Sequence, residues 1–290
     1  MVKTILVPTT GLPSDEIALE TAYRTASLFD AHIECLHVRP DASEMIRGGP
    51  VMDGSVSLAL PEIWSALESE AKARAAMAKK SFDAFCARNV IAMAEKPAAT
   101  KRVTAQWNTV EGGVRAVTLM RAHYNDLVVY GRSRREFDPS LDDISDVVVA
   151  SGKPVLLSPR HAPPKIATTV AIAWKETAEA ARAVSAAMPF LAKAEKILVL
   201  AATERLATEA ISSMERLAAS LRWHGFAPEV DCLETDSSGA PEAVLAASKR
   251  RNVDLLVMGG YGHSRAREYV LGGFTQHMLN KSDVPLFLYH

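Results

Sequence analysis

Residues 253–260 read VDLLVMGG, a run of apolar side chains that ends in two glycines, and residues 125–131 read NDLVVYG, which has the same pattern. Continuous apolar runs of this length are typical of strands buried on both faces of a parallel sheet. Asp126 and Asp254 each lie directly before the apolar run. The two stretches therefore predict one central strand in each half of a repeated structure.

The flanking segments repeat in the same order. Strands that alternate with helices of ten or more residues favour a parallel sheet, because each crossover helix must pack back onto it. We therefore predict two doubly wound α/β domains, each with a mostly parallel five-stranded sheet and helices on both faces. The opening strand, helix and strand are residues 3–9, 14–29 and 32–38 in the first half and residues 168–174, 176–191 and 196–201 in the second.

The first half is longer than the second because it carries an insertion. Residues 39–60 predict a long loop and residues 61–89 a long helix. Residues 159–165, PRHAPPK, contain three prolines and no apolar period, which is typical of a linker. We therefore expect a first domain at residues 1–159 and a second at residues 166–290, called below the first half and the second half.

Composition and charge argue against several classes of protein. Lys and Arg number 33 against 34 Asp and Glu, so the broad basic field of a nucleic-acid binder is not expected. No apolar run reaches the roughly 20 residues that cross a bilayer, and the N-terminus has too short an apolar run for a secretory signal. The three cysteines show no CxxC spacing. We expect a cytoplasmic protein with no nucleic acid and no membrane as partner.

A glycine-rich stretch follows the strand predicted at residues 254–258. Gly259 and Gly262 predict a turn with positive φ that lets backbone N–H groups approach an anion closely. After nine intervening residues, residues 272–275 predict further N–H groups at a helix N-terminus, where the helix dipole favours phosphate. Arg265 or Arg267, between the two clusters, is placed to add a charge-assisted contact. The stretch therefore predicts a phosphate site.

The spacing of these glycines resembles a known motif. Nucleotide-binding universal stress proteins carry G-x-x-G, nine residues and then G-[ST], and Gly259, Gly262 and Gly272 keep that spacing. Both halves also match the family in the order of their elements, so the chain resembles a tandem universal stress protein. The resemblance implies a Rossmann-like, adenine nucleotide alpha hydrolase-like fold. It also implies a stress-response and signalling role, with ATP, with or without Mg, as the ligand.

The resemblance also implies a set of binding residues in the second half. In the family, the glycine loop holds the phosphates and ribose of ATP, and the ends of the first and second strands contact adenine and ribose. No catalytic residue and no metal ligand is predicted. Carried over to this sequence, the binding residues are Ala173, Trp174, Lys175, Leu200, Ala201, Met258, Gly259, Gly260, Gly262, His263, Arg265, Gly272, Gly273, Phe274 and Thr275.

The sequence departs from the family motif in both halves. Lys175 stands where relatives usually carry an Asp, which leaves the Trp174 ring as a candidate for stacking on the base. Gly273 replaces a Ser or Thr, but backbone amides remain the main donors of such loops. In the first half one glycine stands in place of three, with Arg132 at the second glycine position. We therefore predict no ATP in the first half, and a solvated, charged turn at Arg132.

Three functions fit these observations. The favoured one is an ATP-binding signalling module with the nucleotide in the second half. The alternatives are a scaffold without nucleotide and a slow ATP hydrolase, although His263 and Ser264, as neighbours in a loop, do not predict a nucleophile and base. Because domains of the family pair through their last strands, residues 153–158 are expected beside residues 284–289. A homodimer of the whole chain is a further partner that the resemblance allows.

Overall fold

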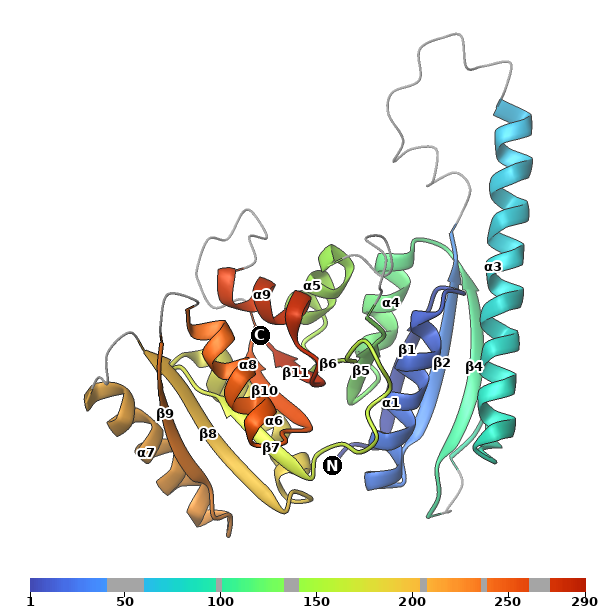
Figure 1. Ribbon diagram of the computed structural model, residues 1–290. Coiled ribbons are helices and arrows are strands. Elements are labelled where there is room, and N and C mark those ends of the chain that lie inside the picture. Colours follow the sequence, from blue (N-terminus) through green and yellow to red (C-terminus); the bar gives the residue numbers. More distant parts are fainter. Residues whose placement is uncertain (41–59, 98–100, 133–140, 204–207, 236–238, 261–271) are drawn as a thin grey trace.

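The chain is described by a computed structural model (Figure 1). The described residues are 1–40, 60–97, 101–132, 141–203, 208–235, 239–260 and 272–290. The strands described in the first half are β1 (Thr4–Thr9), β2 (His32–Arg39), β3 (Ala92–Met93), β4 (Thr104–Glu111), β5 (Leu127–Tyr130) and β6 (Val155–Leu157). Its helices are α1 (Ser14–Phe29), α3 (Leu60–Arg88), α4 (Val114–Ala122) and α5 (Leu141–Ala150).

The second half repeats this order without the insertion. Its described strands are β7 (Thr169–Ala173), β8 (Lys196–Thr203), β9 (Glu229–Glu234), β10 (Leu255–Gly259) and β11 (Leu286–Tyr289). Its helices are α6 (Ala178–Leu191), α7 (Thr208–Trp223), α8 (Ala240–Arg250) and α9 (Gly273–Lys281). The predicted alternation of strands and helices is therefore confirmed in both halves.

The described strands form one continuous sheet of eleven, in the order β3-β4-β2-β1-β5-β6-β11-β10-β7-β8-β9 (Figure 1). All neighbouring strands are parallel except β6 and β11, which are antiparallel. There Leu156 lies opposite Phe287, so the predicted pairing of residues 153–158 with residues 284–289 is confirmed. The two-residue β3 pairs with β4 and follows the long helix of the insertion, which gives the described first half one strand more than predicted.

The two aspartates that mark the repeat have the same structural role. The Asp126 carboxylate accepts hydrogen bonds from the backbone N–H groups of Lys3 and Thr4, at 2.7 and 3.1 Å. Asp254 accepts in the same way from residues 168–169, at 2.8 and 2.9 Å. Each carboxylate therefore ties the start of a central strand to the start of its neighbour, and charge-assisted bonds of this kind are strong.

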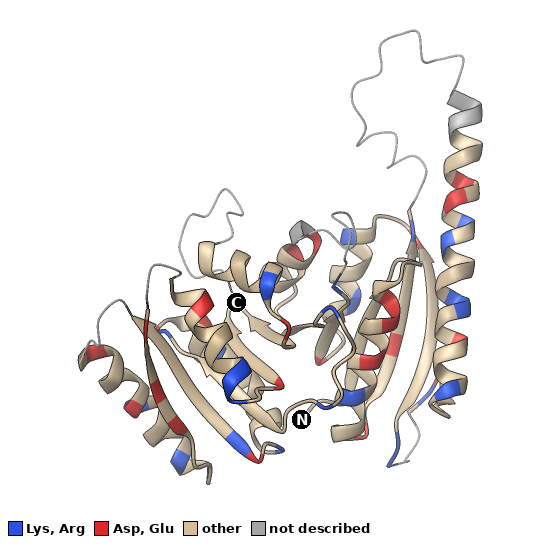
Figure 2. Cartoon of the chain, in the orientation of Figure 1, with Lys and Arg blue, Asp and Glu red and all other residues tan. Residues whose placement is uncertain are grey.

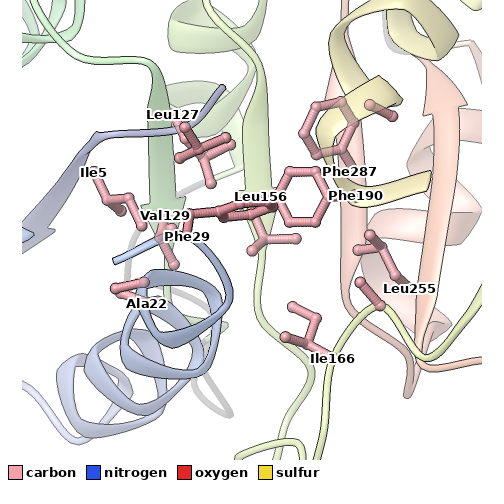
Figure 3. Close-up of a cluster of buried hydrophobic side chains, with 14 of the residues drawn as sticks. Ile5, Ala22, Phe29, Leu127, Val129, Leu156, Ile166, Phe190, Leu255 and Phe287 are labelled. Carbon is pink, nitrogen blue, oxygen red and sulfur yellow. The ribbon is translucent and has the colours of Figure 1, made fainter. Parts of the chain in front are cut away.

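Each face of the sheet carries one apolar core that extends through both halves. Helices α1, α3, α6 and α7 cover one face, and α4, α5, α8 and α9 cover the other. On the first face, Phe190 of α6 packs edge-on against Phe29 of α1, with ring centroids 5.1 Å apart, and lies 5.4 Å from Phe287 of β11 (Figure 3). The two halves therefore share their core along the β6–β11 contact, called below the seam.

Helix α3, which takes the place of α7 but has 29 residues instead of 16, matches its predicted span to within one residue and extends well past the ends of the strands (Figure 1). Acidic and basic residues are interspersed along it, and ion pairs join Lys72 to Glu68 and Arg74 to Glu70, each one turn apart (Figure 2). Such exposed pairs stabilise a helix only slightly. The loop predicted at residues 39–60 lies almost entirely outside the described residues.

Candidate functional site

A cavity of about 660 Å³ opens at the carboxyl ends of β7, β8 and β10 in the second half. The N-terminal ends of α6, α7, α8 and α9 complete its walls. In doubly wound sheets, ligands bind beyond the carboxyl ends of the strands, and cavities of roughly 300–1,000 Å³ accommodate small molecules. The cavity therefore has the position and the size of a ligand site.

Most of the predicted binding residues lie at this cavity. Gly260 is described but does not line it. Gly262, His263 and Arg265 lie outside the described residues. The predicted residues that line the cavity are Ala173, Trp174, Lys175, Leu200, Ala201, Met258, Gly259, Gly272, Gly273, Phe274 and Thr275.

Gly272 and Gly273 begin α9 at the cavity wall. Gly272 is the N-cap, with φ −58° and ψ 138°, and no side chain of the described residues caps this helix end. A Cβ added to either glycine would meet no atom of the described residues within 4 Å. The first turn of α9 also contains no acidic residue. The first backbone N–H groups of α9 therefore keep free donor capacity and positive dipole charge beside an open space.

Gly259 has a different role from the one predicted. It ends β10 and is absent from the described glycines with positive φ, so the predicted left-handed turn at this residue is wrong. A Cβ here would lie 2.6 Å from the backbone nitrogen of Ala180, in the first turn of α6. The position excludes larger residues because the α6 backbone packs directly on it. The same holds in the first half, where a Cβ at Gly131 would lie 2.2 Å from the carbonyl oxygen of Ser14.

Gly260 also packs against protein. Its N–H donates to the Tyr289 carbonyl at 2.8 Å, and its own carbonyl lies 3.1 Å from Nδ1 of His290. A Cβ added to Gly260 would lie 3.1 Å from the Val148 side chain of α5, on the other side of the seam. Gly259 and Gly260 therefore hold the strand end in place.

A short polar network fixes Trp174 at the cavity wall. Its indole N–H donates to the Ser213 hydroxyl of α7 at 2.9 Å. A hydrogen bond from Ser213, together with the guanidinium of Arg216 at 2.9 Å, lowers the pKa of the Glu176 carboxyl. The tryptophan ring is therefore held by its polar edge, with apolar atoms along the wall, an arrangement suited to packing against a flat ring system.

Sequence reasoning missed the carboxylates of the cavity, which come from Glu176, Glu179 and Glu209. Glu179 lies in the first turn of α6, where the N-cap Thr177 accepts from the Ala180 N–H at 3.3 Å. A hydrogen bond from its own backbone N–H lowers the pKa of Glu179. Unlike α9, α6 thus satisfies its N-terminal donors with its own residues. The sequence did contain a signal for Glu179: it lies two residues after Thr177, the Thr that ends the turn between strand and helix.

In the first half, the equivalent turn, which follows β1, is packed by other described residues. The buried Asp15 carboxylate accepts hydrogen bonds from the Thr10 and Gly11 N–H groups, at 3.0 and 2.8 Å. A Cβ at Gly11, which has φ +83°, would lie 2.5 Å from the Arg74 carbonyl, so the α3 backbone presses on this turn. The inserted helix therefore lies against the turn whose second-half counterpart borders the cavity.

Aromatic packing closes the same region further. Trp107 of β4 packs on Phe82 of α3, with ring centroids 5.5 Å apart, and stacks on His37 of β2. The His37 Nδ1 lies 3.0 Å from the Thr9 carbonyl, and burial lowers the pKa of its imidazole. His37 is therefore a buried, hydrogen-bonded histidine of the core.

The comparisons with known proteins agree with this architecture. One family model, the universal stress protein family, matches residues 1–159 and again residues 165–290. The chain belongs to the universal stress protein family. The earlier resemblance to a tandem member is thereby confirmed. Over 81 residues the chain is 33% identical to Universal stress protein Slr1230 of Synechocystis sp. (strain ATCC 27184 / PCC 6803 / Kazusa), a match that spans 28% of this chain and 27% of that protein.

Solved universal stress protein structures share the fold across the whole chain. A universal stress protein from Archaeoglobus fulgidus DSM 4304 superimposes with a TM-score of 0.68 at 15% identity, over 99% of this chain and 97% of that chain. A putative universal stress protein from Pseudomonas aeruginosa UCBPP-PA14 gives a TM-score of 0.52 at 14% identity, over 99% and 93% of the two chains. At these identities the likeness shows the fold alone. Among the described residues, no helix of this universal stress protein is long and apolar enough to cross a bilayer.

Proposed function

We propose that this universal stress protein binds one ATP per chain in the cavity of its second half and acts as a nucleotide-dependent signalling module. The observation that carries the proposal is the N-terminus of α9, where Gly272 and Gly273 leave backbone donors uncapped beside open space. Helix N-termini with unblocked N–H groups are well suited to phosphate.

The distribution of charge supports one orientation of the nucleotide. The three glutamates of the cavity come from the segment after β7 (Glu176), from α6 (Glu179) and from α7 (Glu209), whereas the first turn of α9 carries no carboxylate. Phosphates placed at α9 avoid most of the repulsion from Glu176 and Glu209. Lys175 also lines the cavity and adds a positive charge where family relatives carry an Asp. We therefore assign the phosphates to α9.

The adenine is assigned to the wall formed by the ends of β7 and β8. Trp174 is fixed there by its hydrogen bond to Ser213, and Ala173 and Leu200 add apolar surface. Stacking of a base on an aromatic ring contributes about 1–3 kcal/mol. The described residues contain no group of three or more His, Cys, Asp or Glu that could hold a metal, so Mg would enter with the phosphates.

The test is a calorimetric titration of the full chain with ATP, together with the variant Gly272→Val. Because a Cβ at this position meets no atom of the described part of the chain, the variant should fold normally, yet its branched side chain should occupy the space that the phosphates need. We expect one ATP per parent chain and an affinity at least about tenfold lower in the variant. The matched control is Gly113→Val, the same change at the glycine N-cap of α4, which has φ −66° and ψ 118° and lies away from the cavity.

Two results would contradict the proposal. If the parent binds no ATP, the scaffold alternative takes its place. If two equivalent ATP molecules bind per chain, the first half also binds nucleotide, and the proposal of a single site in the second half is wrong. Mass spectrometry of the denatured, freshly purified protein adds an independent measurement, since an adenine nucleotide retained through purification is expected in about equal amount to the chain.

A further inference from the structure

The solvent exposure predicted for Arg132 is wrong. Arg132 was expected in a solvated turn, but it is only 7% exposed. It follows β5 as Gly260 follows β10, and both residues pack across the seam. Gly260 meets Val148 of α5, whereas the Arg132 guanidinium donates through Nη1 to the carbonyl of Ser282, the C-cap of α9. A residue of the degenerate motif in the first half thus binds the helix that carries the proposed phosphate site of the second.

A second arginine reaches the same helix end. Arg160, in the linker between the halves, donates through Nη2 to the carbonyl of Asn280 at 3.1 Å. The C-terminal carbonyls of a helix have no partner within the helix and carry its partial negative charge, so they attract cations. Two guanidinium groups from outside the second half therefore bind the carbonyls of Asn280 and Ser282, at the C-terminal end of α9.

Burial of Arg132 is unfavourable because part of its guanidinium group is left without a hydrogen-bond acceptor in the described part of the chain. Its Nε and Nη2 atoms are buried and find no acceptor among the described residues. Burial, with a smaller contribution from the charge of Arg160, lowers the pKa of the Arg132 guanidinium to about 10. The group is still charged at neutral pH, and a buried charge with unpaired donors is destabilising. The bond to the Ser282 carbonyl and the nearby negative charge of Asp283 partly compensate this cost.

We propose that Arg132, together with Arg160, forms an arginine clamp on the C-terminal end of α9 that holds the N-terminal amides of this helix in position for phosphate. α9 is short, so a shift at its C-terminal end moves the whole helix as one body. Arg132 is thus a positioning residue that acts through α9 and does not touch the ligand. The part that concerns phosphate rests on the proposed function, whereas the clamp itself does not.

The experiment compares the full-length parent with Arg132→Met, Arg132→Lys and a matched control, Arg121→Met. Arg121 is also a first-half arginine with a buried, unpaired Nε, but its guanidinium pairs with Glu34 at 3.3 Å and not with α9. Amide hydrogen exchange is followed over α9 and, as internal reference, over α6. The affinities for ATP and for adenosine, which lacks phosphate, are measured in parallel.

The clamp predicts a specific pattern. Arg132→Met should speed exchange of the α9 amides by at least about tenfold while leaving α6 unchanged. It should weaken ATP binding by at least about fivefold and leave adenosine binding unchanged, because only the phosphates meet α9. Arg132→Lys keeps a positive donor and should restore part of both effects. Arg121→Met should produce neither.

The proposal is overturned if α9 exchange is unchanged in Arg132→Met, or if Arg121→Met has the same effect on α9. An equal loss of ATP and adenosine binding would reduce Arg132 to a general structural role. If the parent binds neither ligand, the proposed function fails. In that case the exchange of α9 alone decides whether the clamp exists.

Discussion

The two halves of this chain share a fold but differ at the place where such folds bind ligands. In the second half, the carboxyl ends of β7, β8 and β10 open into a cavity. In the first half, the Asp15 carboxylate occupies the turn after β1, and α3, the longer counterpart of α7, packs against Gly11 and Trp107. Apart from β3 the order of the described elements is the same in both halves, so the difference comes from one buried carboxylate and one long helix.

This contrast indicates which features make the carboxyl end of a parallel sheet suitable for a ligand. Parallel strands and helix N-termini are present in both halves, but free backbone donors beside open space are found among the described residues at α9. The first half instead packs on the second, through the shared phenylalanine core and through Arg132. If the proposed function holds, the two halves divide the work: one half binds the ligand and the other supports α9.

The first prediction has the largest expected effect. It concerns the glycine that each half places at the end of its central strand. Gly131→Ala and Gly259→Ala should each lower the free energy of unfolding by about 3 kcal/mol, because each new Cβ would collide with a helix backbone that cannot move aside. Urea denaturation measures this. Gly273→Ala is the control, since its Cβ meets open space, and it should change stability by less than about 1 kcal/mol.

The second prediction concerns a feature that separates the halves. Asp15→Ala should lower the free energy of unfolding by about 2 kcal/mol, because the buried N–H groups of Thr10 and Gly11 lose a charged acceptor. Thr177→Ala removes the neutral N-cap of α6 in the second half and should cost about 1 kcal/mol. Equal losses in thermal or urea unfolding would show that the carboxylate in the first half has no special role.

The third prediction has the smallest effect and tests the repeat itself. Asp126→Asn and Asp254→Asn should each lower the free energy of unfolding by about 1 kcal/mol, because an amide keeps one acceptor oxygen but loses the charge. The two values should agree within about 0.5 kcal/mol. A loss confined to one variant in parallel urea titrations would mean that the two aspartates are not equivalent.

Much of the fold followed from local sequence patterns. The predicted spans of α1, α3 and β1 agree with the structure to within one residue, because amphipathic helices and apolar strands have clear periods. Family resemblance also identified half of the residues that line the cavity. Glu179 and Glu209 were missed because their signal, an acid in the first turn of a helix, is common at any helix N-terminus.

What the sequence alone determined is therefore the repeated order of strands and helices, the pairing of the last strands and the position of the glycine-rich stretch. Only the tertiary structure decided what individual residues do. It showed that Gly259 is required by the close approach of α6, that α3 fills the first half, and that Arg132 is buried against α9. The physical reason is that periodicity and spacing are properties of neighbours in sequence, whereas burial and close approach arise from segments that meet only when the chain has folded.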